Sequence, residues 1–422
     1  MLARPGFSNH VQALLGIALL LGLSYALSED RAGINWRAIG GGLALQLALA
    51  LLLIDLPAAR FLMLGLNRAV DALQIATDSG TVFVFGYLGG GRLPFAETEQ
   101  GASFILAFKV LPLVLTISAL SALLTHWGVL QAAMRGFAWL LRGTLGIGGA
   151  LSLGAAVHVF VGMVEAPLLI RPWLARMSRG EIFALMTCGM AGIAGTVMAI
   201  YGVILGRVIP DALGTVFSAA IISTPAALAV AGLMIPPGPP DTDDSRLVLP
   251  HKPAGSLDAL VRGTADGVGP LVGIATMLIV SVALVTLINL VLGHLPDIAG
   301  QPVTLERIAS LPFRPVMWLI GIPWSESATA AQLMGTKTIL NEFVAYLHLA
   351  ALPETALSPH SRLIMTVALC GFANLASVGI LVGGLRAMVP ERADEVTGLG
   401  LRSLLSGTLA TCLSGAWAGL LT

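Results

Sequence analysis

The chain has 422 residues, of which 56% are hydrophobic and only 11% are charged. Because water-soluble domains carry about 25% charged residues, this composition excludes a soluble globular protein and indicates one whose solvent is the lipid bilayer. The 23 basic side chains balance the 23 acidic ones, so the charge gives no indication of a nucleic-acid partner.

Apolar runs of membrane-spanning length follow one another along the chain. A run of about 18 or more apolar residues can cross the hydrocarbon core of a bilayer. The first run has no basic segment before it and no small-residue cleavage site followed by a soluble domain, so we interpret it as a retained helix. The sequence predicts eight such runs, at 11–27, 39–54, 104–124, 183–205, 216–235, 271–292, 363–385 and 399–421.

Two other segments have the pattern of helices that lie in the membrane surface. In residues 56–80, apolar side chains at helical spacing between Leu62 and Leu73 share one face, and charged side chains lie elsewhere. Residues 256–268 have a similar pattern. They follow the Pro-rich, acidic stretch 236–253, which we interpret as a solvated linker that divides the chain into two portions.

These two portions resemble each other. The sequences CGMAGIA at 188–194 and CGFANLA at 370–376 share four of seven residues, and an acid inside an apolar segment precedes each of them, Glu165 in one and Glu342 in the other. Chance similarity of Gly- and Ala-rich helices would explain the first match, but the paired acids favour a duplication. Interrupted apolar segments in corresponding positions of two halves are typical of a transporter binding site.

Glu165 lies in VFVGMVEAPLLIRP, where nothing else is charged before Arg171. An acid at the bilayer centre costs about 2.5 kcal/mol or more, and Gly162 and Pro167 both disfavour a continuous helix. We therefore predict a hairpin with its tip at membrane depth, where unwound backbone faces a wet cavity.

Glu342 repeats this pattern in MGTKTILNEFVAY. An ion pair with Lys337 would give both residues a structural role. Alternatively, a carboxylate accepts hydrogen bonds through two oxygens and can hold the vicinal hydroxyls of a sugar. Asn374 and Ser377, three residues apart in CGFANLAS, point the same way on a helix and would either bind the same ligand or join neighbouring helices.

No pattern in the sequence indicates an enzyme or a metal site. GxSxG and HExxH motifs are absent, and the seven histidines are scattered singly. A hydrolytic carboxylate pair formed by Glu165 and Glu342 is the one enzymatic alternative, but binding already explains both acids. We expect no cofactor, and we expect the three cysteines to be buried apolar side chains: Cys188, Cys370 and Cys412.

Three stretches carry a family resemblance. GMVEAPLLIRPWL, MGTKTILNEFVAY and ALCGFANLASVGILVGGL resemble the concentrative nucleoside transporter family, and TVFVFGYLG and GLRSLLSGTLA support the likeness from residue 81 to the C-terminus. The resemblance implies an all-α polytopic membrane protein with about eight transmembrane helices and two re-entrant helical hairpins. It also implies an inverted-repeat transport domain held by a scaffold domain, in a homotrimer with one pathway per protomer.

On this basis the chain divides into four portions. Residues 1–124 form the N-terminal scaffold helices and an interfacial helix. Residues 125–235 form the first repeat, with hairpin 1 and a broken helix (183–205), and residues 236–295 form a linker, an interfacial helix and a scaffold helix. Residues 296–422 form the second repeat, with hairpin 2 and a broken helix (363–385).

The resemblance also assigns the substrate site, with one departure. It places Glu165 and the two residues before it against the nucleobase, and Glu342, Asn374 and Ser377 against the ribose. Members of the family usually carry Gln and Thr before the first glutamate, whereas this chain has Met163 and Val164, which cannot hydrogen-bond a base. The base selectivity therefore stays open between a broader or purine-tolerant range and a modified nucleoside or nucleoside-like solute.

The predicted cation site departs further from the family pattern than the substrate site does. Sodium-coupled members use an Asn and a Ser at the positions of His158 and Gly192, with backbone carbonyls near Val161 and Ile193. Because histidine changes charge near neutral pH, we expect proton coupling through His158 or Glu165. Sodium held by carbonyls, and a packed His158 bonded to the backbone, are the alternatives.

The predicted function is therefore cation-coupled import of nucleosides by alternating access, through a multi-pass protein of the bacterial inner (plasma) membrane. A sensor or gate protein built on a related module would lack parts of the transport core, whereas both hairpins and both broken helices are expected here.

Overall fold

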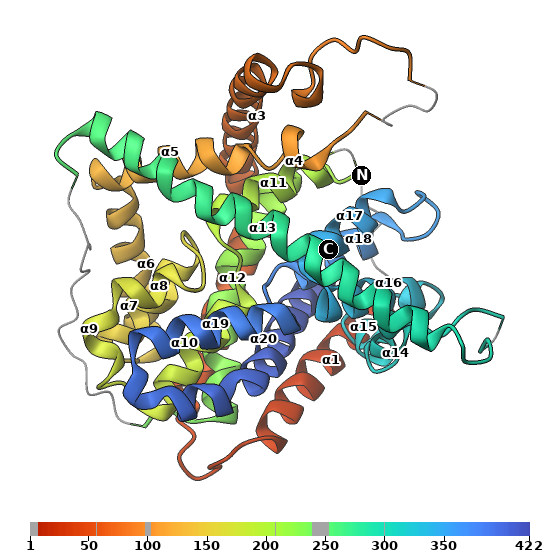
Figure 1. The fold of residues 1–422 in the computed structure, drawn as a ribbon. Coiled ribbons are helices and arrows are strands. Elements are labelled where there is room, and N and C mark those ends of the chain that lie inside the picture. Colours follow the sequence, from red (N-terminus) through yellow and green to blue (C-terminus); the bar gives the residue numbers. More distant parts are fainter. Residues whose placement is uncertain (1–6, 56, 98–102, 207, 239–252, 299) are drawn as a thin grey trace.

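The protein is a bundle of helices (Figure 1). The computed structural model describes residues 7–55, 57–97, 103–206, 208–238, 253–298 and 300–422. In these ranges there is no β-strand, and the only bridge of that kind pairs Ile298 with Gln301. Most of the predicted linker, 239–252, lies outside the described residues.

The helices of the first half are α1 (Phe7–Ala26), α2 (Trp36–Ala50) with a π-helical turn (Leu51–Asp55), α3 (Pro57–Phe85) with a 3₁₀ turn (Gly86–Gly89), α4 (Leu106–Lys109), α5 (Leu113–His126), α6 (Val129–Leu145), α7 (Gly149–His158), α8 (Glu165–Leu169), α9 (Arg171–Leu174), α10 (Arg179–Ala191), α11 (Gly195–Leu205) and α12 (Ala212–Met234).

Those of the second half are α13 (Ser256–Leu292), α14 (Leu305–Ser310), α15 (Phe313–Leu319), α16 (Trp324–Ile339), α17 (Glu342–Ala351), α18 (Pro359–Leu369), α19 (Leu375–Met388), a 3₁₀ turn (Pro390–Arg392) and α20 (Ala393–Leu421).

Both predicted hairpins are present. In hairpin 1, α7 ends at His158 and α8 begins at Glu165, so the tip is not helical where Gly162 lies. In hairpin 2, α16 ends at Ile339 and α17 begins at Glu342. Each acid therefore starts the second arm of its hairpin, where the first amides of the helix have no partner within it.

Both predicted broken helices are present as well. The first consists of α10 and α11, and the second of α18 and α19. The two breaks touch each other, because the Phe372 amide donates a 3.1 Å hydrogen bond to the Gly192 carbonyl. A Cβ atom at Gly371 would lie 2.9 Å from the Met190 carbonyl oxygen, so only glycine permits this approach of the two chains.

The scaffold helix α13 corrects one prediction. We expected a surface helix at 256–268 followed by a separate spanning helix, but α13 is one helix of 37 residues. Its first turns pack on α5, where Cβ atoms at Gly263 and Gly267 would come within 2.5 Å and 2.9 Å of α5 side chains. This close contact between small residues holds the first half of α13 in line with the second.

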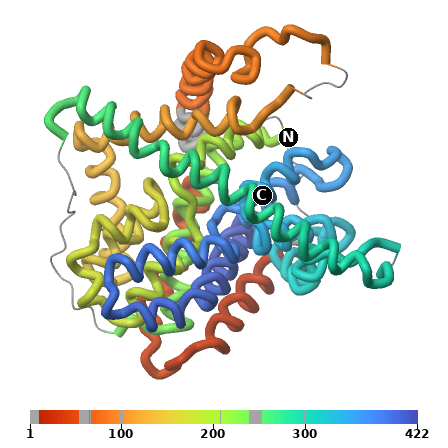
Figure 2. The backbone as a smooth tube through the Cα atoms, in the orientation of Figure 1, coloured from red at the N-terminus to blue at the C-terminus, as the bar shows by residue number. Residues whose placement is uncertain are grey.

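The core lies around α12, α10 and α20, which are strongly buried, whereas α13 is 6% buried over its apolar window. Six described helical segments are long and apolar enough to cross a membrane, and α1 and α19 are shorter apolar helices. The first and last helices of the described chain pack against each other, α1 on α20 (Figure 2).

Candidate substrate site

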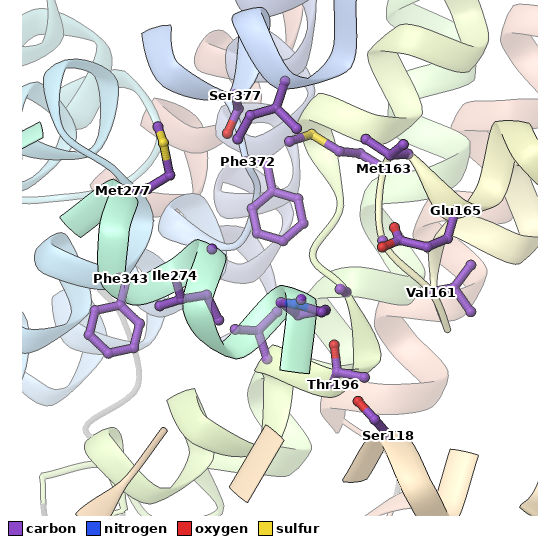
Figure 3. A pocket seen from close by; sticks show the side chains of 18 of the residues that line it. Ser118, Val161, Met163, Glu165, Thr196, Ile274, Met277, Phe343, Phe372 and Ser377 are labelled. Atoms are coloured by element: carbon purple, nitrogen blue, oxygen red, sulfur yellow. The ribbon is translucent and has the colours of Figure 1, made fainter. Parts of the chain in front are cut away.

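A cavity of about 610 Å³ lies between the scaffold and the two hairpins. Residues of hairpin 1, hairpin 2, both broken helices, α5 and α13 line it (Figure 3). All six residues predicted to bind substrate line it: Met163, Val164, Glu165, Glu342, Asn374 and Ser377. The two acids thus share one cavity, as the sequence predicted.

Glu342 is held from both repeats. Its side chain is 4% exposed. The Tyr201 hydroxyl, on α11, donates a hydrogen bond of 2.7 Å to Oε1, and the Asn374 amide, at the start of α19, donates one of 3.1 Å to Oε2. Both carboxylate oxygens are therefore fixed in direction, and the acceptor positions left on them are available to a ligand that reaches the cavity.

Two asparagines explain why this end of the cavity is polar. Asn341 is the N-cap of α17 and accepts a hydrogen bond from the Val344 amide at 2.9 Å, and Asn374 is the N-cap of α19 and accepts one from the Ser377 amide at 2.8 Å. N-caps of this kind fix where a helix begins. The sequence therefore places the positive ends of two helices at the cavity.

The hairpin 1 end is less polar. Glu165 is exposed, and its carboxylate folds back over Gly162, because a Cβ atom there would lie 2.2 Å from Oε2. Met163 is 8% exposed, and Val164 packs on α19, since its Cγ1 would lie 2.9 Å from a Cβ atom at Gly384. Apolar surface stands beside Glu165 where the family usually has hydrogen-bonding side chains.

Of the four predicted cation-coupling residues, only Val161 lines the cavity. His158 is 4% exposed at the end of α7, and its Nε2 has no hydrogen-bond partner in the described part of the chain. The Gly192 carbonyl already accepts from Phe372, and Ile193 is 1% exposed. The side chains at these four positions carry no oxygen atom, so only backbone carbonyls could bind a sodium ion there.

Lys337 does not pair with Glu342. It is fully buried, and its ammonium donates to the Ala368 carbonyl at 2.9 Å and to the Thr411 hydroxyl at 3.2 Å. The Ala368 carbonyl needs this donor because the amide four residues later, of Phe372, bonds to Gly192 instead. Lys337 therefore joins hairpin 2 to the second break and to α20.

Sequence reasoning missed Tyr201. It lies in the apolar run of α11, but the structure buries it against Tyr346 with 4.8 Å between ring centroids and points its hydroxyl at Glu342. The chain has only four tyrosines, so a tyrosine inside an interrupted apolar segment was the available signal. Buried phenols usually find a polar partner.

Two hairpins and two broken helices that meet at one cavity, with scaffold helices behind them, define the transport core of a polytopic membrane transporter. Three family models match the chain: "Na+ dependent nucleoside transporter N-terminus" at 15–88, "Nucleoside recognition" at 107–208, and "Na+ dependent nucleoside transporter C-terminus" at 215–419. The chain belongs to this nucleoside transporter family, whose members are transporters and not enzymes.

Relatives are similar over nearly the whole chain. An uncharacterized transporter of Haemophilus influenzae is 35% identical, with 97% of each chain covered. The nucleoside permease NupC of Helicobacter pylori is 32% identical, again with 97% of each covered. The human sodium/nucleoside cotransporter 1 is also 32% identical, over 96% of this chain and 63% of its own length.

Solved structures of relatives cover different transport states. CNTnw in an inward-facing substrate-bound state matches with a TM-score of 0.89 at 35% identity, over 98% of this chain and 99% of that one. A double variant of CNTnw in an outward-facing state matches with a TM-score of 0.90 at 34% identity, over 99% and 98%. The family thus adopts both states that alternating access requires.

Proposed function

We propose that this chain imports nucleosides across the bacterial inner membrane by alternating access, as a homotrimer driven by protons. The observation that carries the proposal is the shared cavity of Glu165 and Glu342. Glu342, Asn374 and Ser377 supply acceptors and donors for two ribose hydroxyls, and two helix N-termini point toward the same end.

The transport step follows from how the moving part is tied together. Hairpin 2 is bonded to the second break through Lys337, and that break is bonded to the first one through Phe372 and Gly192. These links favour movement of both hairpins and both broken helices as one body. The substrate would then cross with them past α5 and α13, and no covalent bond in it would change.

The shortage of side-chain oxygen ligands at the predicted cation positions supports a proton as the coupling ion. Sodium requires several hard oxygen ligands, whereas the sequence places His158 and Gly192 where sodium-coupled members have Asn and Ser. The Gly192 carbonyl is also engaged by Phe372. His158 and Glu165 each have a titratable group, and neither makes a salt bridge within the described residues. Sodium held by the remaining carbonyls is the second candidate, and the family description favours it.

A modified nucleoside, or a nucleoside-like solute, is the second candidate substrate. Met163 and Val164 favour it because they present apolar surface beside Glu165. Such a surface discriminates between bases weakly.

Uptake into proteoliposomes tests the proposal. The purified chain should accumulate labelled nucleosides, chemically unchanged, under an imposed pH gradient with sodium absent. Full uptake driven by a sodium gradient at equal pH on both sides would reject proton coupling. Competition by free bases but not by nucleosides would reject the ribose assignment of Glu342, Asn374 and Ser377.

A further inference from the structure

The scaffold wall of the cavity carries polar groups of its own. Asp266 of α13 lines the cavity, as do Ser118, Ser121 and Thr125 of α5. The three α5 hydroxyls follow at three- and four-residue spacing and so share one face of that helix. None of these four residues belongs to a hairpin or to a broken helix.

Asp266 lies where α13 packs on α5 at the cavity wall. Its neighbour Gly267 packs on α5, where an added Cβ would lie 2.9 Å from the Ser118 Cβ. Ser118 appears on the same side of the cavity as Glu165, with Met277 and Phe343 on the other side (Figure 3). Met277 is 11 residues beyond Asp266 on α13, about 16 Å along the helix.

Two kinds of acceptor meet at Asp266. Its carboxylate makes no hydrogen bond or ion pair among the described residues, and Arg262, one turn away, bonds to Asp258 instead at 2.8 Å. Its backbone carbonyl lacks the usual donor four residues later, because that residue is Pro270, which has no N–H. The Asp266 side chain is exposed, so a ligand in the cavity can reach its carboxylate.

We propose that Asp266 is a specificity-determining residue that recognises an exocyclic amino group on the nucleobase, and this inference rests on the proposed function. An amino group such as that of cytosine or adenine donates N–H bonds, which the carboxylate of Asp266 can accept. A base with an oxo group at that position brings an acceptor against this acceptor. The scaffold thus replaces the discrimination that Met163 and Val164 cannot provide.

Two substrate pairs isolate this effect, because cytidine and uridine, and adenosine and inosine, exchange an amino for an oxo group at one ring position. Initial uptake at low substrate concentration is measured in proteoliposomes for the wild type and for Asp266→Asn. Asp297→Asn is the matched control, since Asp297 is an exposed acid just beyond the end of α13 that does not line the cavity.

The wild type should prefer the amino member of each pair by at least about tenfold, the size expected for a hydrogen bond to a charged group. Asp266→Asn should bring both ratios toward one, because an amide also donates, and Asp297→Asn should leave them unchanged.

Three results decide against the assignment. Wild-type ratios near one reject it without any variant, even if Asp266→Asn is not recovered in folded form, and so do ratios that Asp266→Asn leaves unchanged. In both cases nucleosides are still transported and the proposed function stands. A wild type that accumulates no nucleoside rejects the proposed function and this inference with it.

Discussion

The Tyr201 hydroxyl lies 2.7 Å from Oε1 of Glu342 and donates to it. Tyr201 belongs to the first broken helix, and Glu342 begins the second arm of hairpin 2. The hydrogen bond therefore joins the two repeats at the residue we expect to hold the ribose.

Tyr201→Phe removes this donor and leaves one oxygen of a buried carboxylate without a partner, at a cost of about 1–3 kcal/mol. We expect the apparent affinity for nucleosides to fall about tenfold, as measured by uptake over a range of concentrations. Tyr346→Phe is the control, because that hydroxyl donates to the Thr366 carbonyl and not to Glu342. Equal losses of nucleoside affinity in Tyr201→Phe and Tyr346→Phe would contradict the proposed role of the Tyr201–Glu342 hydrogen bond.

Asn374 has two functions that different substitutions separate. Asn374→Asp keeps the acceptor that caps α19 but replaces the donor to Glu342 with a second carboxylate, and two carboxylates in contact resist ionising together. Asn374→Ala loses both functions, and the lost cap alone costs about 1 kcal/mol. We expect both variants to lose nucleoside affinity, and only Asn374→Ala to lower the thermal unfolding midpoint through the cap.

The parts predicted well from sequence were those that a local pattern determines. The glycine, proline and acid near residue 165 break a helix wherever it lies, so hairpin 1 was predictable. The division of α13 was wrong, because the contact of Gly263 and Gly267 with α5 overrides the local amphipathic pattern. Tyr201 was missed because its role arises from a long-range contact with Glu342, and spacing along the chain carries no record of it.

Lys337 should matter for stability rather than for binding. Lys337→Met keeps the length of the side chain but leaves the Ala368 carbonyl without its donor, and we expect the free energy of unfolding to fall by about 1–3 kcal/mol. Thermal unfolding in detergent measures this. Lys109→Met, which removes a lysine that stacks on Phe104 outside the core, should have little effect. A similar loss of unfolding free energy in Lys337→Met and Lys109→Met would contradict a stabilising role of the buried Lys337 hydrogen bonds.

Glu29 lies between α1 and α2, outside the spanning segments, and its ion pair with Arg179 gives a pH dependence. The Arg179 guanidinium hydrogen-bonds to Glu29 and lowers the pKa of its carboxyl below the ordinary 4.5, an effect that partial burial opposes and that the charges of Arg179 and Arg402 assist. Because the folded pKa is the lower one, this stabilisation is complete above about pH 4.5 and is lost as the pH falls through the folded pKa.

Glu29→Gln should therefore lower the free energy of unfolding at pH 7 by about 0.5–1 kcal/mol, the range of exposed ion pairs. The difference from the wild type should disappear at acid pH, as thermal unfolding in detergent would show. Asp30→Asn is the control, because Asp30 accepts hydrogen bonds only from its own loop, at Ala32 and Gly33. A difference that persists below the folded pKa of Glu29 would contradict the ion-pair explanation.

The choice of coupling ion can be tested at a single position. The family resemblance places His158 where we expect sodium-coupled members to have an asparagine. Its Nε2 has no partner in the described ranges, so His158→Asn removes a proton acceptor and supplies a hard oxygen. We expect pH-driven uptake to fall strongly and sodium to begin to stimulate it, in proteoliposomes where each gradient is imposed alone. His348→Asn, an exposed histidine of hairpin 2, should change neither dependence. If His158→Asn keeps the wild-type pH dependence of uptake and Glu165→Gln abolishes it, Glu165 carries the proton. The absence of oxygen-bearing side chains at positions 158 and 192 would then be a consequence of proton coupling and not its mechanism.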